Sequence, residues 1–328
     1  MTILNQYANH FAPAYSNYPQ GRYVTLIIAR WIESEAIFRT EGSGEPLNKE
    51  FVHAGISHPE TIQRVVISKR KQTAVERRTG RELLRRHDLL FESKPNAGIC
   101  ALNRNNPCEK CLDCMIYGYA AGGGGAQKAR VITDDAFSLH PAQQITDEKT
   151  FNAPFDNSSP WERDTSQDSK GKQMTGLGQD EYVRPQAVFV DMETIKDVTI
   201  AEFQYILGNV LRSSRYGAIS SRIGKVQNEL LGIVFSDCEL FSNLELTQVS
   251  YDRLVGDNAE LDFPLSKDLV HQAVQEAATS LMGRVVGQTT TLSSTEVAQL
   301  RQETVDLYGD EAGLVALLQE TGLMYGPQ

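Results

Sequence analysis

The chain has 328 residues, of which 41% are apolar, so it can bury one large core with insertions or two domains. Its apolar runs are far too short to span a bilayer, and Met1 to Ala12 carries no secretory signal, so we expect a cytoplasmic protein without a membrane partner. A formal net charge of −10 argues against nonspecific binding of nucleic acid over the whole surface.

The first expected element is a β-strand over Arg22 to Trp31. Val24, Leu26 and Ile28 lie on one of its faces, and residues 23, 25 and 27 on the other are also largely apolar. Because both faces can be buried, we predict a central position in a sheet. Residues 41–46, rich in Gly, Glu and Pro, form a loop after it.

A strongly basic segment follows. Arg64 to Arg86 contains nine Lys or Arg residues and two Glu, a net charge of +7, so the remaining residues carry −17. A helix from about Gln72 to Leu90 places several of these cations on one face, where they can bind phosphates. A solvated charged face is the alternative. The residues predicted to bind RNA here are Lys69, Arg70, Arg77, Arg78 and Arg81.

Four of the five cysteines fall in one short stretch. Cys108, Cys111 and Cys114 are each two residues apart, and Cys100 precedes them. Thiolates at this spacing can converge on one point, and four of them satisfy tetrahedral zinc, so we predict a structural zinc site. Either His87 or His140 could replace Cys100 as the fourth ligand. An iron–sulfur cluster is the rival interpretation, although the usual following Cys-Pro is missing.

The composition changes between Pro141 and Gln179. This stretch is polar and rich in Asp, Ser, Gly and Gln, with isolated apolar residues such as Phe155, Trp161 and Met174. Such a segment is either disordered alone or an extended, hairpin-like projection that contacts a partner or bases.

Strands are next expected at Ala187 to Asp191 and Leu230 to Asp237. Between them, Thr199 and Glu202 form a capping box that starts a helix running to about Leu211, which completes a compact βαβ unit. A second basic group follows that helix, where small residues allow phosphate to approach and a tyrosine could stack on a base. Its predicted RNA-binding residues are Arg212, Arg215 and Tyr216.

The C-terminal part is expected to be helical. Ser266 to Gly283 has helical apolar spacing, and a capping box at Ser293 to Glu296 starts one final helix. From Thr295 onward the chain is acidic, which suits a subunit contact better than a nucleic-acid surface.

The opening strand, the basic segment at 68–72, the Pro107 to Gly118 cysteine motif and the Arg212 to Ala218 turn together resemble the CRISPR type I-D Cascade backbone subunit. The resemblance implies an α+β fold: an RRM-like (ferredoxin-like) palm at 1–95 and 183–262, a zinc-binding insertion at 96–140, a thumb at 141–182 and C-terminal helices at 263–328. It also implies a subunit that lines up in several copies along a CRISPR guide RNA, with other Cascade subunits, and presents the guide to target DNA or RNA.

The resemblance also suggests an alternative function. Related backbone subunits of type III complexes cleave RNA with an acidic residue after the first strand, and this chain offers Glu33, Glu35, Glu41 and Glu45 there. Asp134 and Asp135 are a second acidic pair. A metal-dependent RNA or single-stranded DNA endonuclease is therefore the second hypothesis, and an electron carrier with a cysteine-bound cluster is the third.

Overall fold

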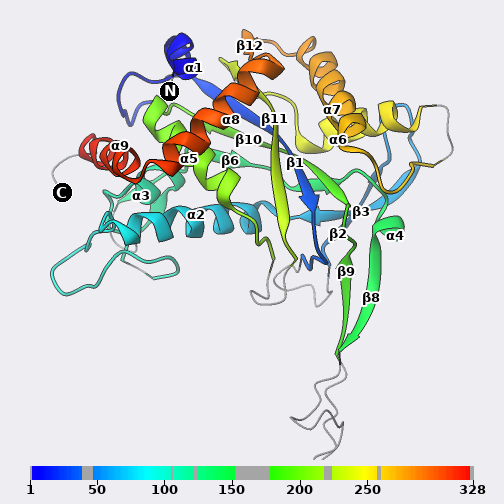
Figure 1. Cartoon of the computed structure of the whole chain (residues 1–328), viewed down its shortest axis with the longest axis horizontal. Helices are drawn as coiled ribbons and strands as arrows, with labels where there is room; N and C mark the ends of the chain where they lie inside the picture. The colour runs from blue at the N-terminus through cyan, green and yellow to red at the C-terminus, as the bar shows by residue number, and fades with distance from the viewer. Residues whose placement is uncertain are drawn as a thin grey trace, which may run out of the picture.

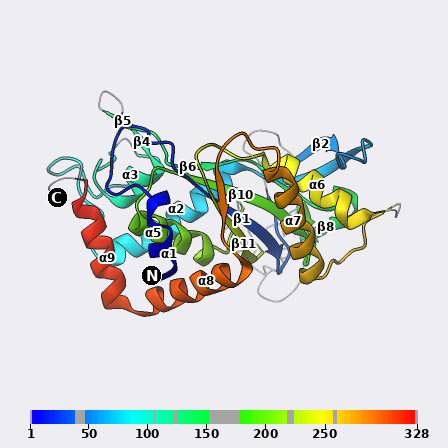
Figure 2. The ribbon, with the colours of Figure 1, turned by 90° about the horizontal axis from the view of Figure 1, so that it is seen from above.

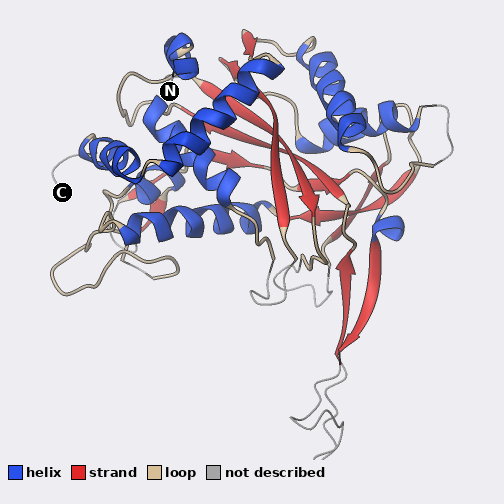
Figure 3. Cartoon of the chain, in the orientation of Figure 1, coloured by secondary structure: helices blue, strands red, loops and turns tan. Residues whose placement is uncertain are grey.

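A computed structural model describes residues 2–38, 47–104, 106–121, 125–151, 178–217, 224–256 and 260–325. It shows a mixed α+β protein built on an antiparallel sheet (Figures 1 and 3). Within the described residues the sheet has eight strands, in the order β12-β11-β1-β10-β7-β3-β2 with β6 also paired to β10. Its strands are β1 (Tyr23–Ile32), β2 (Lys49–His53), β3 (Thr61–Ile67), β6 (Val131–Thr133), β7 (Ala136–Ser138), β10 (Val188–Lys196), β11 (Val226–Ser236) and β12 (Thr289–Thr291).

The predicted central strand is confirmed. β1 pairs with β10 on one side and β11 on the other, both antiparallel. Leu26 and Ile28 on one face pack in a core with the helices α2 (Lys69–Arg86), α5 (Ile200–Arg212), α8 (Ser294–Gly309) and α9 (Glu311–Leu323). Ile27 and Ala29 on the other face pack against α6 (Asn243–Val255) and α7 (Lys267–Met282). Figure 2 shows the sheet running between these two groups of helices.

Helix α2 begins and ends earlier than the predicted Gln72 to Leu90. Its first backbone N–H, at Lys69, donates to Asp135 Oδ1 at 2.8 Å, so a distant carboxylate caps the helix. The chain leaves the helix at His87, and Asp88 takes a left-handed conformation with φ 56°. Gly80 lets α5 approach closely, because a Cβ there would lie 2.4 Å from both Asn209 Nδ2 and Tyr205 Oη.

The cysteine-bearing insertion follows α2. It contains the short helix α3 (Leu112–Tyr117) and the two-stranded ribbon β4 (Tyr119–Ala120) with β5 (Ala126–Gln127). The N-terminal elements α1 (Thr2–Gln6) and η1 (Ala8–His10) complete this end of the molecule, and Figure 1 places α3 beside the C-terminal end of α2.

A two-stranded hairpin projects from the sheet beyond the short helix α4 (Ala142–Ile145) (Figure 1). Its strands, β8 (Thr146–Phe151) and β9 (Gly178–Val183), pair antiparallel along their whole described length. A β-bridge between Ala36 and Val183 and an ion pair of 2.7 Å between Lys149 Nζ and Glu35 Oε2 join the hairpin to the segment after β1. Phe155, Trp161 and Met174 lie outside the described residues.

In the second half of the chain, most helices and strands are of the type that the sequence predicted. The Thr199–Glu202 capping box at the start of α5 is confirmed, and strands β10 and β11 lie at the predicted places, although each is longer. The single helix expected after Ser293 is wrong, because the chain forms two helices that break at Asp310, whose side chain accepts from Gly313 N at 3.1 Å. Among the described residues, no helix is long and apolar enough to cross a membrane.

Candidate metal centre and basic groove

The structure brings the four predicted cysteines together. Cys100, Cys108, Cys111 and Cys114 are all buried, and their sulfur atoms lie within 4.8 Å of one another. The sulfur of Cys100 is 3.6 Å from that of Cys114, and Cys108 Sγ is 4.0 Å from it. Zinc–sulfur bonds of about 2.3 Å in a tetrahedron require sulfur separations of about 3.8 Å, so the four residues fit a zinc ion.

The local backbone explains this convergence. Glu109 has a left-handed φ of 64°, and the chain turns so that the N–H of Cys111 donates to Cys108 Sγ at 3.3 Å. The N–H of Cys114 likewise donates to Cys111 Sγ at 3.5 Å as α3 begins. Such N–H groups stabilise thiolates, which are the metal-binding form.

The histidine alternatives for the fourth ligand do not reach the cluster. His87 Nε2 lies 3.8 Å from a carboxylate oxygen of Glu311, and His140 Nε2 donates to the carbonyl oxygen of Asp262 at 2.9 Å. The pKa of the Cys111 thiol is raised well above its usual range, by hydrogen bonding with Cys100 first and then with the other two sulfurs. A cation bound among them would favour the thiolate form of all four groups.

Helix α2 also lines an open groove of about 820 Å³ beside β6. Four cationic residues on its rim, Lys69, Arg70, Arg78 and Arg85, are exposed, and the hydroxyls of Thr73 and Thr133 lie 3.1 Å apart at its wall. The groove therefore combines exposed positive charge with hydrogen-bonding groups, which is the chemistry that binds a phosphate backbone.

Two other cations predicted to bind RNA, Arg77 and Arg81, are held inside the protein. Both bind the buried carboxylate of Asp113, with the shortest separations 2.8 Å for Arg77 and 2.7 Å for Arg81. The side chain of Arg81 is only 4% exposed and that of Arg77 is 19% exposed. They line the floor of the groove but their charge is already paired with Asp113.

The second basic group lies next to α2. Ser213 Oγ donates to Thr79 Oγ1 at 3.0 Å, which places the turn after α5 against the helix. Arg212 and Arg215 are exposed, and the guanidinium of Arg212 lies 5.3 Å from the centre of the Tyr308 ring. Arg222, in the same basic group, lies outside the described residues.

Tyr216 requires a correction. It was predicted to stack on a base, but its ring is completely buried and packed under the Arg30 guanidinium. Its hydroxyl donates to Glu76 Oε1 at 3.1 Å and accepts from Arg30 and Asn228, each at 2.8 Å. The ring has no face left for a base, so Tyr216 holds the turn from inside.

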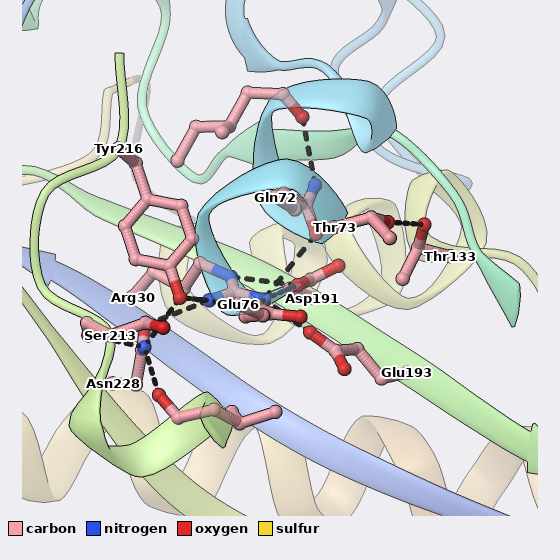
Figure 4. A network of polar contacts seen from close by, with 12 residues as sticks. Arg30, Gln72, Thr73, Glu76, Thr133, Asp191, Glu193, Ser213, Tyr216 and Asn228 are labelled. Carbon is pink, nitrogen blue, oxygen red and sulfur yellow. Dashed lines mark hydrogen bonds and ion pairs between the residues drawn. The ribbon is translucent and has the colours of Figure 1, made fainter. Parts of the chain in front are cut away.

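The sequence analysis missed the network to which Tyr216 belongs (Figure 4). Its centre is Arg30, which is fully buried in β1 and pairs with Asp191 at 2.6 Å, Glu193 at 2.8 Å and Glu76 at 3.2 Å. Burial raises the pKa of Asp191 to about 6 and that of Glu193 well above its usual range. One guanidinium cannot neutralise three carboxylates, so the buried network favours protonation of its acidic groups. In the sequence, this network could have been recognised from the charged residue that interrupts each of two apolar strands.

Three of the carboxylates proposed for cleavage have structural partners. Glu33 pairs with Lys225 at 3.5 Å, Glu35 pairs with Lys149, and Asp135 caps α2. For Asp134, it is the backbone carbonyl oxygen that accepts, from the side chains of Gln72 and Asn243. Glu41 and Glu45 lie outside the described residues. Within the described part of the chain, the four cysteines are the group of residues able to hold a metal.

Comparison with known proteins identifies the family. A family model described as Csc2 Crispr matches residues 10–318. The chain is similar to the crystal structure of Thermofilum pendens Csc2, with a TM-score of 0.56 and 18% identity over 85% of this chain and 81% of that one. Chains of two structures, titled CRISPR RNA-guided surveillance complex and the same complex pre-nicking, each give a TM-score of 0.47. Their identities are 10% and 9%, over 82% and 81% of this chain and 87% and 90% of theirs. No curated protein matches the sequence. Since the family model covers nearly the whole chain, the protein belongs to the Csc2 CRISPR family.

Proposed function

We propose that this protein is a guide-RNA-binding backbone subunit of a type I-D CRISPR interference complex. It binds the phosphates of the guide along α2, oligomerises along it with other Cascade subunits, and leaves the bases free to pair with target DNA or RNA. The observation that carries the proposal is the α2 groove, whose exposed cations stand in a chain with a net charge of −10. Family membership supports the same function.

The arrangement of the sheet supports an RRM-like palm as part of this proposal. Strands β1, β7, β10 and β11 with helices α2 and α5 follow one another as strand, helix, strand, strand, helix, strand, and they lie in the sheet as β11-β1-β10-β7. That order, with antiparallel neighbours, is what we expect of a ferredoxin-like palm. We assign the palm to residues 1–95 and 183–262, the structural zinc insertion to 96–140, the thumb to 141–182 around the β8–β9 hairpin, and the C-terminal helices to 263–328.

The guide contacts that we propose are Lys69, Arg70, Arg78 and Arg85 in the groove, with Arg212 and Arg215 at the neighbouring turn. Electrostatic binding to single strands loses affinity with salt by a slope of about 0.7 per phosphate contact. An Arg78→Gln/Arg85→Gln double variant should therefore bind single-stranded RNA more weakly and lower the salt slope by about 1.4. The control is Arg253→Gln/Arg284→Gln, which removes two exposed arginines from the opposite side of the sheet, at α6 and after α7.

Copy number tests the assembly. Native mass spectrometry with RNAs of increasing length should show bound copies rising in steps, with one zinc per chain. A fixed single copy at every length would overturn the filament.

The same RNAs, labelled and incubated with Mg²⁺, test the endonuclease alternative: cleavage that is lost on substitution of Glu33, Glu35 and Glu41 would establish it in place of a purely structural subunit.

A further inference from the structure

The arginines of α2 serve two different environments. Arg78 and Arg85 are exposed on the rim of the groove, whereas Arg77 and Arg81 point to the cysteine-bearing insertion. All four look equivalent in a count of basic residues on one helix. Their contacts in the structure divide them.

Arg81 touches the cysteine cluster directly. One of its terminal nitrogens, Nη1, lies 3.7 Å from Cys100 Sγ and 2.7 Å from Asp113 Oδ2. The other, Nη2, donates to the backbone carbonyl of Cys100. The guanidinium therefore fixes the one cysteine that stands apart from the x2-spaced triplet.

Arg77 holds the other end of the same segment. Its Nε and Nη2 donate to the two carboxylate oxygens of Asp113 at 3.0 and 2.8 Å, and Nη2 also donates to Gly118 O at 3.1 Å. Asp113 is completely buried between the ligands Cys111 and Cys114. Gly118 has φ 80°, and a Cβ there would lie 2.6 Å from Gln127 O, so the turn that ends the segment is also tightly fitted.

The charges explain why these groups are needed. Four thiolates and one divalent zinc carry a formal charge of −2, and the carboxylate of Asp113 brings the buried total to −3. Two guanidinium groups reduce it to −1. Buried charge without such compensation is costly, and groups that hold metal ligands in place commonly change metal affinity 10–100-fold when they are removed.

We infer that Arg81 and Arg77, joined through Asp113, are positioning residues of the metal site and not guide contacts. The inference rests on the proposed zinc site, and it is independent of whether the groove binds RNA. Helix α2 would then separate two tasks on one element: the inward arginines retain the metal, and the outward arginines bind phosphate.

The test compares Arg81→Gln with Arg85→Gln, its matched control one turn further along α2. Each zinc-loaded protein is mixed with the chromogenic chelator 4-(2-pyridylazo)resorcinol, and RNA affinity is measured on the same preparations. We expect Arg81→Gln to release zinc about 10–100-fold faster while retaining the salt slope of RNA binding. Arg85→Gln should release zinc at the unaltered rate but bind RNA more weakly.

Arg81→Lys separates a positioning role from general destabilisation. Lysine retains the charge but cannot bridge Asp113 and Cys100 with a planar fork, so its zinc release should lie between the other two rates. Arg77→Gln replaces Arg81→Gln if the latter does not fold by circular dichroism. Wild-type zinc release from Arg81→Gln, or from Arg77→Gln in its place, would overturn the inference. If Arg81→Gln releases zinc faster but Arg85→Gln binds RNA as well as wild type does, the result counts against the proposed RNA-binding groove. The inference about the metal site would then stand.

Discussion

The buried network around Arg30 allows a prediction about stability. Replacing Arg30 by Met preserves much of its volume but leaves Glu76, Asp191 and Glu193 without their cation, and all four side chains are inaccessible to solvent. Removing one partner of a buried ion pair typically costs about 3–5 kcal/mol. We expect Arg30→Met to lower the free energy of unfolding by at least that amount at pH 7, because three carboxylates share the loss.

A second variant of the network tests its protonation. Burial first, and then the charge of Glu76, raises the pKa of Glu193 above its ordinary value of 4.5. A group with a raised pKa contributes stability below its ordinary value and loses it as the pH rises through the folded value. Glu193→Gln supplies a permanently neutral group, so it should match wild type near pH 4 and exceed it in stability increasingly as the pH rises.

Urea unfolding followed by circular dichroism between pH 4 and 8 measures both effects. Arg253→Met is the matched control, since Arg253 forms an exposed ion pair with Glu276 and should contribute less than about 1 kcal/mol. An Arg30→Met variant within 1 kcal/mol of wild type, or a Glu193→Gln variant whose stability follows wild type at every pH, would refute the charge balance that we assign to the network.

Three further predictions concern other contacts. Tyr216→Phe removes a hydroxyl that makes three buried hydrogen bonds, so it should cost about 1–3 kcal/mol in urea unfolding and make the Arg212–Gly217 turn more sensitive to protease; unchanged stability would contradict its anchoring role. Cys100→Ser should reduce zinc to well below one per chain by atomic emission, whereas Cys238→Ser, outside the cluster, should not. Gly80→Ala should destabilise by about 1–3 kcal/mol because the buried side chains of Asn209 and Tyr205 must shift, whereas Gly309→Ala, where the added Cβ has no neighbour within 4 Å, should have little effect.

The metal centre could be predicted from the sequence because its information is local. Cys108, Cys111 and Cys114 are separated by single turns of chain, so their spacing alone directs the sulfurs to one point. The central strand was equally accessible, because apolar residues on both faces of β1 report two buried sides. The cysteine spacing could be interpreted because the residues that matter are close in the sequence. The central strand could be predicted because any hydrophobic core can provide the packing that its two apolar faces need.

The roles of individual charged residues depend on partners far away in the chain. Arg81 meets Asp113 across 32 positions, and Tyr216 meets Glu76 across 140. Helical periodicity gives the residues that share a face of α2, but not what packs against that face. The two later predicted strands were too short for the same reason. Asp191 and Asn228 look like ends of strands by composition, although Arg30 satisfies both within the sheet.

One helix thus organises the metal site, the buried network and the groove. Glu76 and Gln72 face Arg30, Arg77 and Arg81 face the cysteine-bearing insertion, and the remaining exposed cations face solvent. A shift of α2 would disturb the metal site, the buried network and the groove together. A variant designed to change one of them should therefore be tested for effects on the other two. Only then can a loss of RNA binding be assigned to a lost phosphate contact. Removing Arg77 or Arg81 should leave the salt slope of RNA binding unchanged, because both already pair with the carboxylate of Asp113.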